Sequence, residues 1–278
     1  IPDLQKIEDV IQKTNPGALL VIPYDNPTGQ FIDIEQFAKL AKLCVKYNLW
    51  LISDEAYREL QYTYKPVSSI WGITDKLVPG IIGRRISIES TSKVWNACGL
   101  RIGAIITDNP EYHQKSVAEN TASLCSSVIG QFIFGAIAHQ SHKDLQSWFV
   151  KQRKYYQSLL LSFTSELKSK IPGIIVSSPE ASIYSVIDVR NIAPQKFDSE
   201  DFVDYCATKG SVTIHNKKYT LLVSPMAGFY TVNQNHSNPG KTQMRIAYVE
   251  SPENMQLIPY LLSELLKQYF KKASSIRV

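Results

Sequence analysis

The apolar residues of the N-terminal half alternate between strand-like runs and a helical stripe. Residues 18–23 (ALLVIP) form an uninterrupted apolar run, which is typical of a strand buried on both faces. Asp33 and Gln36 then form a variant of the capping box, and the next apolar residues recur on one helical face, namely Phe37, Leu40, Ala41, Cys44 and Val45. Residues 50–53 (WLIS) form a second short apolar run. This order predicts a βαβ unit with parallel strands and a right-handed crossover.

Two more strands and a long helical region are expected further along. Residues 85–89 and 100–107 have the pattern of a third and a fourth strand, and residues 110–140 are mostly helical in pattern. A long helix with one apolar stripe is expected from Lys143. It should end at Pro172-Gly173, because this pair does not continue a helix, and a domain boundary is expected there.

The last third of the chain has shorter elements. Strands are expected at residues 174–176, 183–189, 219–223 and 244–249. Helices are expected at residues 199–208 and from Ser251-Pro252 onward, with Pro259 kinking or splitting the second. The sequence therefore predicts an α/β fold with three parts: a large domain with a mostly parallel sheet (1–142), a connecting helix (143–172) and a smaller α+β domain (173–278).

Composition and charge narrow the class of protein. The 278 residues are 44% hydrophobic and 20% charged, as in ordinary globular proteins, and the net charge is +5. Basic and acidic residues are interspersed, so no nucleic-acid or membrane-surface partner is implied. No apolar run reaches the roughly 20 residues that span a bilayer. The four cysteines lie far apart, which favours reduced thiols in the cytoplasm, and no metal site is indicated.

Polar side chains follow three of the expected strands. Asn26 follows the first, Asp54 ends the second, and Ser90-Thr91-Ser92-Lys93 follow the third. Ligands of open parallel sheets bind beyond the carboxyl ends of the strands, so these residues should lie close together. A lysine amine, a carboxylate, an amide, a tyrosine (Tyr57), hydroxyls and an arginine (Arg101) together suit pyridoxal phosphate. Its phosphate would be bound by the hydroxyls and the planar guanidinium.

Each of these motifs alone has an ordinary structural explanation. Asn-Pro-Thr-Gly is a common turn, and Asp54-Glu55 could be an acidic pair at a helix N-terminus. A single lysine or arginine such as Lys93 or Arg101 is usually solvated, and Tyr57 could be a core residue. Arg245 is harder to explain in this way, because a guanidinium on a central strand must find an anion. Several such motifs occur together, and three of them stand at strand ends that should converge. This coincidence favours a functional site.

Five motifs resemble those of the class I/II aminotransferases, which are fold type I pyridoxal-phosphate enzymes. The motifs are YDNPTG (24–29), DEAYREL (54–60), STSK (90–93), GLRIG (99–103) and MRIAYV (244–249), in the order and approximate spacing of that family. The resemblance covers nearly the whole chain and extends to PEASIY (179–184), where Ser182 stands in place of the usual alanine. It implies a three-layer large domain plus a small C-terminal domain, and a homodimer.

The resemblance also implies a role for each site residue. Lys93 would form the internal aldimine and move the proton, and Asp54 would pair with the pyridinium nitrogen. Asn26 and Tyr57 would bond the phenolic oxygen of the cofactor. Ser90, Arg101 and, as a weaker candidate, Ser92 would hold the phosphate. Arg245 would bind the α-carboxylate of the substrate.

In this family, about a hundred residues usually precede the position of Ile1. That segment normally supplies a glycine-rich phosphate loop, the aromatic residue that stacks on the cofactor ring and a tyrosine that reaches across the dimer. We therefore expect the sequence to represent an aminotransferase without its N-terminal segment. We expect this chain alone to bind the cofactor weakly and to turn over little or nothing.

The expected activity is transfer of an amino group between an L-amino acid, of aspartate or aromatic type, and a 2-oxo acid. One alternative is a non-transaminating enzyme on the same scaffold, such as a C–S lyase, a decarboxylase or a synthase. Another is a regulatory domain that senses a ligand. Retention of Lys93, Asp54, Arg101 and Arg245 together favours catalysis.

Overall fold

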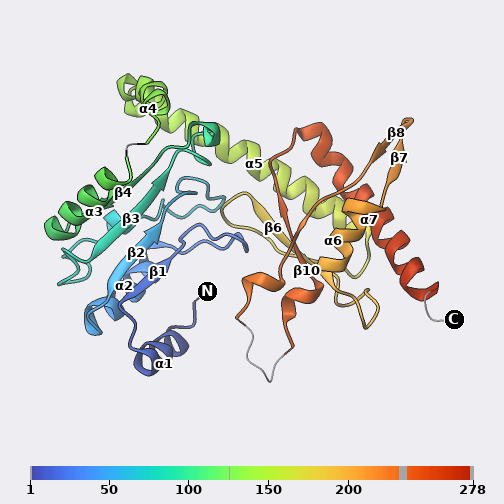
Figure 1. Ribbon diagram of the computed structural model, residues 1–278, viewed down its shortest axis with the longest axis horizontal. Helices are drawn as coiled ribbons and strands as arrows, with labels where there is room; N and C mark the ends of the chain where they lie inside the picture. The colour runs from blue at the N-terminus through green and yellow to red at the C-terminus, as the bar shows by residue number, and fades with distance from the viewer. Residues whose placement is uncertain (1, 125, 232–236, 276–278) are drawn as a thin grey trace. The chain divides into compact units, whose positions relative to one another are not determined.

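The computed structural model describes residues 2–124, 126–231 and 237–275, and its elements group into two units (Figure 1). The first unit comprises Ile1–Asn26, Gln30–Arg153 and Glu180–Ser182. The second comprises Pro27–Gly29, Lys154–Pro179 and Ile183–Val278. The long helix α5 (His142–Lys170) contributes to both units. Whether it acts as a separate connecting part, as the sequence predicts, stays a prediction.

The first unit is built on a four-stranded sheet in the order β1-β2-β3-β4. The strands are β1 (Ala18–Val21), β2 (Trp50–Asp54), β3 (Arg85–Ser90) and β4 (Gly103–Thr107). β1, β2 and β3 are parallel, and β4 runs antiparallel to β3. The predicted βαβ unit is confirmed, with α2 (Ile34–Lys46) as its helix. Its start is fixed by Asp33, whose carboxylate accepts the N–H of Gln36 at 2.9 Å.

Helices cover one face of this sheet with a continuous apolar core. α1 (Leu4–Thr14) was not expected from the sequence; Asp3 caps its start and Asn15, with φ of 44°, ends it. The core contains buried residues of α1, α2, β1, β2 and the segment that includes the 3₁₀ turn η1 (Ile70–Gly72), among them Ile11, Val21, Phe37, Leu40, Leu51, Ile70 and Ile81.

Two expectations for the first unit need correction. The first strand is not buried on both faces, since Leu20 is 56% exposed. β1 is an end strand of the sheet in the described residues, and Leu20 points to the face opposite the helices. The fourth strand starts at Gly103, not at residue 100, because the 3₁₀ turn η2 (Cys98–Leu100) comes first and Arg101 takes a left-handed conformation with φ of 57°.

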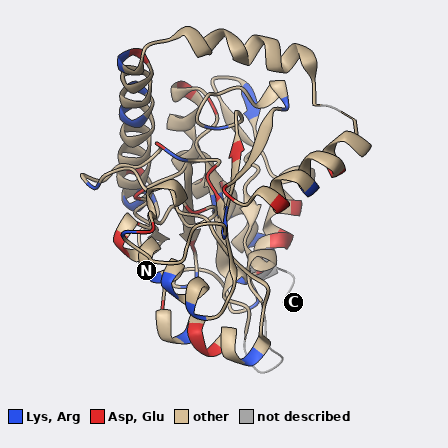
Figure 2. Ribbon diagram, turned by 90° about the vertical axis from the view of Figure 1, so that its left-hand side faces the viewer, with Lys and Arg blue, Asp and Glu red and all other residues tan. Residues whose placement is uncertain are grey.

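Two helices follow β4, namely α3 (Pro110–Ala122) and α4 (Val128–Gly135), which continues into the 3₁₀ turn η3 (Ala136–His139). α4 is apolar but exposed: the side chain of Phe132 is 83% accessible and those of Val128, Ile129 and Ile133 are exposed as well. Residues 126–140 contain no Lys, Arg, Asp or Glu. In Figure 2, α4 and η3 accordingly appear as a tan helix along the top of the view.

The second unit has its own four-stranded antiparallel sheet in the order β5-β6-β10-β9. Its elements are β5 (Ile175–Val176), β6 (Tyr184–Asp188), α6 (Ser199–Thr208), the hairpin β7 (Val212–Ile214) and β8 (Lys217–Tyr219), β9 (Ser224–Pro225), the turns η4 (Ala227–Phe229) and η5 (Pro239–Thr242), β10 (Gln243–Ala247) and α7 (Pro252–Ser275). The strand expected at 219–223 is wrong, because most of that segment is irregular. Pro259 does not split α7.

Among the described residues, no helix is long and apolar enough to cross a membrane.

We expect Phe37→Ala to lower the free energy of unfolding by about 3–5 kcal/mol, because Phe37 is fully buried between α2 and the sheet. Urea denaturation measures this loss. Lys39→Ala on the exposed side of the same helix should stay within about 0.5 kcal/mol of the parent. Equal losses for the two variants would contradict the assignment of the core.

Candidate functional site

The carboxyl ends of β1, β2 and β3 lie at one edge of the sheet. Val21 pairs with Ser53, and Asp54 pairs with Ile88, so β3 extends two residues beyond the end of β2. Asn26 follows β1, Asp54 ends β2, and Ser90 ends β3. The predicted convergence of these strand ends is confirmed. The roles of the individual side chains stay predictions.

The two faces of the sheet carry different polar groups at this edge. Side chains alternate along a strand, so Asp54 and Ser90 point to the face opposite that of Glu55 and Glu89. Ser53 and Ser87 are on the same face as Glu55 and Glu89, and both are fully buried. At this edge, Asp54 and Ser90 therefore lie on the face opposite the helices, called the open face below. Ser53, Ser87 and the two glutamates lie on the face that the helices cover.

The loop that carries Lys93 is held by Thr91. The Thr91 hydroxyl lies 3.2 Å from the carbonyl oxygen of Ala97 and 3.0 Å from that of Ile102, within reach of a shared hydrogen bond. The backbone of Thr91 also pairs with both residues. Ser90 Oγ accepts the N–H of Ser92 at 3.1 Å, and Lys93 is half-buried in the turn that follows. The sequence interpretation gave Thr91 no role, although a buried threonine in a polar loop indicates such a support.

Arg101 lies at the other end of this loop. It is exposed, and its guanidinium donates to the carbonyl of Cys98 at 2.9 Å. Two residues on, Gly103 pairs with Ser90, and a Cβ at Gly103 would meet the carbonyl oxygen of Glu89 at 2.8 Å. The absence of a side chain at Gly103 allows β4 to approach β3 beside Ser90.

Asn26 and Tyr57 sit in turns beyond the strands. The loop that contains Asn26 is closed by the N–H of Asp25, which donates to the carbonyl of Gln30 at 2.9 Å, and Gly29 has a φ of 72° that suits glycine. Tyr57 is buried. Asp54 Oδ1 accepts the N–H of Ala56 at 3.1 Å, and the residues after it form turns. The alternative of an acidic pair at a helix N-terminus is therefore wrong.

A charged group behind the sheet was missed by the sequence interpretation. Arg58 forms ion pairs with Glu55 at 2.8 Å and with Glu89 at 2.9 Å. Burial raises the pKa of Glu89; Arg58 opposes this shift and Glu55 adds to it. The sequence does contain a hint of this group. Glu89 lies two residues after Ser87, so the two side chains share one face of the expected strand, and that face must be covered.

Arg245 belongs to the second unit. It lies on β10, paired in register with Val186 and Ser224. Its guanidinium carbon is 4.4 Å from the centroid of the Tyr184 ring and 5.3 Å from that of Phe229. Both distances are within the range of cation–π attraction. The side chain is half-buried, which suits a group that is fixed and still reachable.

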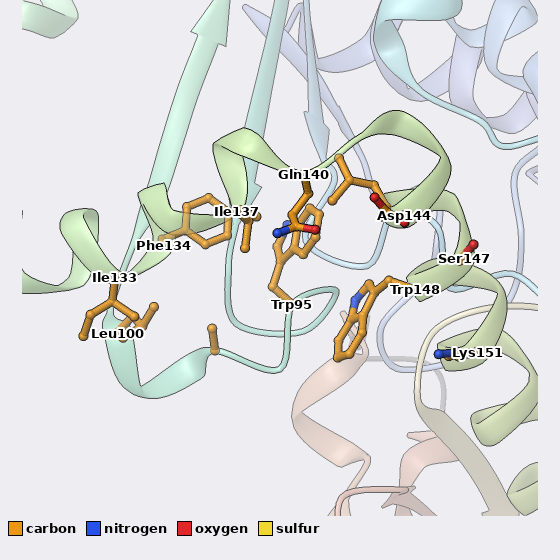
Figure 3. Close-up of a pocket in the computed structure, with 12 residues that line it drawn as sticks. Trp95, Leu100, Ile133, Phe134, Ile137, Gln140, Asp144, Ser147, Trp148 and Lys151 are labelled. Atoms are coloured by element: carbon orange, nitrogen blue, oxygen red, sulfur yellow. The ribbon is translucent and has the colours of Figure 1, made fainter.

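The first unit also has an apolar pocket of about 540 Å³ (Figure 3). Trp95, Leu100, Phe134, Ile137 and Trp148 supply its apolar lining, with Asp144 and Lys151 on α5. None of the twelve lining residues is a predicted site residue. The helix α4 forms part of the pocket wall, because Ile133 and Phe134 of α4 line it.

Within residues 2–124, 126–231 and 237–275, no group of three or more His, Cys, Asp or Glu side chains could hold a metal ion. Cys44, Cys98 and Cys206 are free thiols.

The family model described as "Aminotransferase class I and II" matches residues 2–257. Among curated relatives, the chain is 29% identical over 217 residues to LL-diaminopimelate aminotransferase 2 of Nostoc sp., covering 77% of this chain and 51% of that protein. It is 26% identical over 179 residues to aspartate aminotransferase of Musicola paradisiaca, covering 63% and 41%. The chain thus spans about half the length of these relatives.

Two solved structures show the same fold. N-succinyldiaminopimelate aminotransferase from Mycobacterium tuberculosis superposes with a TM-score of 0.77 at 18% identity, covering 95% of this chain and 62% of that chain. LysN, the α-aminoadipate aminotransferase of Thermus thermophilus, was complexed with N-(5'-phosphopyridoxyl)-L-leucine; its TM-score is 0.77 at 21% identity, covering 96% and 63%. The predicted fold class, fold type I with a mostly parallel sheet, is confirmed.

We expect Glu89→Gln to change stability in a pH-dependent way. Burial raises the pKa of Glu89, so the folded chain binds this proton more tightly than the unfolded chain. The resulting stabilisation is fully present below the unfolded pKa of about 4.3 and is lost as the pH rises through the folded pKa. Glutamine does not titrate. The free energy of unfolding of the variant relative to the parent, from urea denaturation, should therefore rise from about pH 4 to about pH 7.

Glu111→Gln is the control of opposite sign. Lys115 lowers the pKa of Glu111, so its carboxylate stabilises the fold above the unfolded pKa. The stability of this variant relative to the parent should fall, weakly, over the same pH range, because the pair is exposed. A constant difference for Glu89→Gln at every pH would contradict the prediction.

Proposed function

Because the chain belongs to the family of class I and II aminotransferases, we propose that it acts in a pyridoxal-phosphate-dependent enzyme that moves an amino group from an L-amino acid to a 2-oxo acid. Aspartate or an aromatic amino acid is the proposed donor. The observation that carries the proposal is the placement of Asp54 and the Ser90–Lys93 segment at the ends of adjacent parallel strands. This edge is where open α/β sheets bind their ligands.

The donor set at this edge fits the cofactor. Five side chains of the first unit supply it: Asp54 gives a carboxylate, Lys93 a primary amine, Ser90 and Ser92 hydroxyls, and Arg101 a guanidinium. When bound, pyridoxal phosphate supplies an electron sink for the Cα carbanion of an amino acid. Its charged groups are a ring nitrogen and a phosphate, which call for an acid and for several donors.

Each proposed residue would contact one part of the cofactor. Lys93 Nζ would bind its aldehyde carbon, and the same amine would move a proton at the substrate Cα. Asp54 would pair with its ring nitrogen. Asn26 and Tyr57 would bind its phenolic oxygen, and Ser90, Ser92 and Arg101 would hold its phosphate.

Arg245 is proposed to bind the α-carboxylate of the substrate. A guanidinium presents a planar fork that matches a carboxylate with two parallel hydrogen bonds. The rings of Tyr184 and Phe229 contact the guanidinium and limit its rotation. This contact supports a fixed carboxylate site on β10.

We further propose a homodimer that uses α4. The exposed apolar side chains Val128, Ile129, Phe132 and Ile133 form one patch, and residues 126–140 carry no formal charge. A two-fold interface brings each patch against its own copy, and an uncharged patch does so without like-charge repulsion. The buried free thiols Cys44 and Cys206 support a cytoplasmic location, which is proposed on this basis alone.

We expect Lys93→Ala to abolish the visible absorption band that pyridoxal phosphate gives when it is bound to a lysine, because the reacting amine is removed. Absorption titration of the parent and the variant measures this. Lys39→Ala, at an exposed lysine on α2, is the control and should keep the band. An equal band in the parent and in Lys93→Ala would show that another lysine reacts.

The same preparation tests the reaction itself. This chain alone is expected to turn over little, so the amount of 2-oxo acid that the parent releases from an amino acid and a second 2-oxo acid should be small, and Lys93→Ala should release none. Release of ammonia or carbon dioxide in place of amino transfer would identify a non-transaminating enzyme.

We expect Phe132→Glu to shift the protein from dimer to monomer, because a charge would be buried without a partner in the α4 interface. Sedimentation velocity gives the mass, and circular dichroism verifies the fold. Val117→Glu introduces the same charge at an exposed apolar position of α3 and should leave the dimer intact. An unchanged mass for Phe132→Glu would exclude α4 from the interface.

A further inference from the structure

A partly buried group of three charged side chains, Glu55, Arg58 and Glu89, joins the ends of β2 and β3 on the face opposite Asp54 and Ser90. Glu55 is 1% exposed, and its carboxylate accepts hydrogen bonds from Ser53 Oγ (3.1 Å), Ser69 Oγ (2.8 Å) and the N–H of Ile70 (2.6 Å). Arg58 Nη1 donates to Glu55 Oε2 at 2.8 Å, and Arg58 Nη2 donates to Glu89 Oε2 at 2.9 Å. One guanidinium therefore bridges two carboxylates from neighbouring strands.

Glu89 has a further hydrogen-bond partner besides Arg58, namely Ser87. Ser87 Oγ donates a hydrogen bond to Glu89 Oε1 at 3.2 Å. Ser87 Oγ in turn accepts a hydrogen bond from Trp71 Nε1 at 3.1 Å. Trp71 belongs to η1, whose neighbour Ser69 bonds Glu55. The segment around η1 thus holds both carboxylates, and Arg58 is the side chain that connects them directly.

The bridge is coupled to the site by the backbone. Asp54 is the residue before Glu55, and Ser90 is the residue after Glu89. The N–H of Glu55 donates to the carbonyl of Ile88 at 2.9 Å, which continues the ladder to the end of β2. Peptide groups are planar, so a displacement of Glu55 or Glu89 on one face displaces Asp54 or Ser90 on the other.

The charge balance makes Arg58 essential to this geometry. A carboxylate as buried as Glu55 needs a cationic partner, and two carboxylates repel each other if the guanidinium between them is lost. Arg58 binds both carboxylates, each through a different nitrogen of its planar guanidinium. A lysine keeps the charge but has no fork that can bridge the two groups.

We propose that Arg58 is a positioning residue that, by bridging Glu55 and Glu89, fixes the separation between Asp54 and the Ser90–Lys93 loop and thereby sets the affinity for pyridoxal phosphate. This role rests on the proposed function. Arg58 acts through the two glutamates and the strand ends that carry them.

The test is an absorption titration of Arg58→Lys with pyridoxal phosphate. Lys93 is intact, so the bound band should still form. Its dissociation constant should rise about tenfold or more, because small displacements of reacting groups are costly. Urea denaturation of the same variant records the loss of stability.

Arg190→Lys is the matched control. Arg190 Nε donates to Asp188 Oδ2 at 2.6 Å, and Asp188 is 3% exposed, so this is again an arginine bound to a buried carboxylate. Both residues belong to the second unit, whereas the strand ends of the proposed site belong to the first. The variant should lose stability and keep the dissociation constant of the parent.

The double variant Arg58→Lys with Glu89→Gln separates position from stability. Removal of one carboxylate relieves the repulsion, so stability should recover, while the weak binding should persist because no fork bridges the strands. Parental affinity in Arg58→Lys, an equal loss of affinity in Arg190→Lys, or recovery of affinity together with stability in the double variant would each overturn the positioning role. Absence of the band in the parent would instead overturn the proposed function, and this role with it.

Discussion

The register between β1, β2 and β3 is the constraint on which the proposed site depends. Parallel pairing brings Asn26, Asp54 and Ser90 to one edge although they are distant in sequence. A slip of one residue would move Asp54 to the covered face and Glu55 to the open face. The apolar residues under α2, such as Val21 and Leu51, oppose this slip because it would expose them. The core thus determines which of two adjacent acids is available to a ligand.

The sequence predicted this arrangement because its signals are local. Asp33 caps a helix that lies between two apolar runs. Two neighbouring strands that are connected through such a helix pair in parallel. The failures concern properties that local signals do not contain. The apolar run 18–23 does not reveal that Leu20 lies on a strand at the end of the sheet. Arg101, with its positive φ, follows the packing of the loop around Thr91, which no periodicity encodes.

Glu89 illustrates the same limit for electrostatics. From the sequence it is a single acid before STSK, and a solvated position is its common environment. In the structure it is packed behind the sheet with Glu55, and burial raises its pKa. Two acids with one arginine between them leave a net negative charge in a partly covered space. Burial of these charges costs desolvation free energy, so the group contributes little net stability. We therefore attribute to it a role in positioning the strand ends.

The two proposed arginine sites are held by different contacts. Arg58 donates hydrogen bonds to the carboxylates of Glu55 and Glu89, and these bonds tie it to two strands. Arg245 is in contact with the rings of Tyr184 and Phe229, and a ring contact restrains the plane of a guanidinium through its face. A structural bridge is strongest when its partners are permanent, whereas a residue that binds and releases a carboxylate must keep its orientation in both states. The ring contacts at Arg245 therefore suit recognition of a substrate, and the carboxylate contacts at Arg58 suit a fixed part of the scaffold.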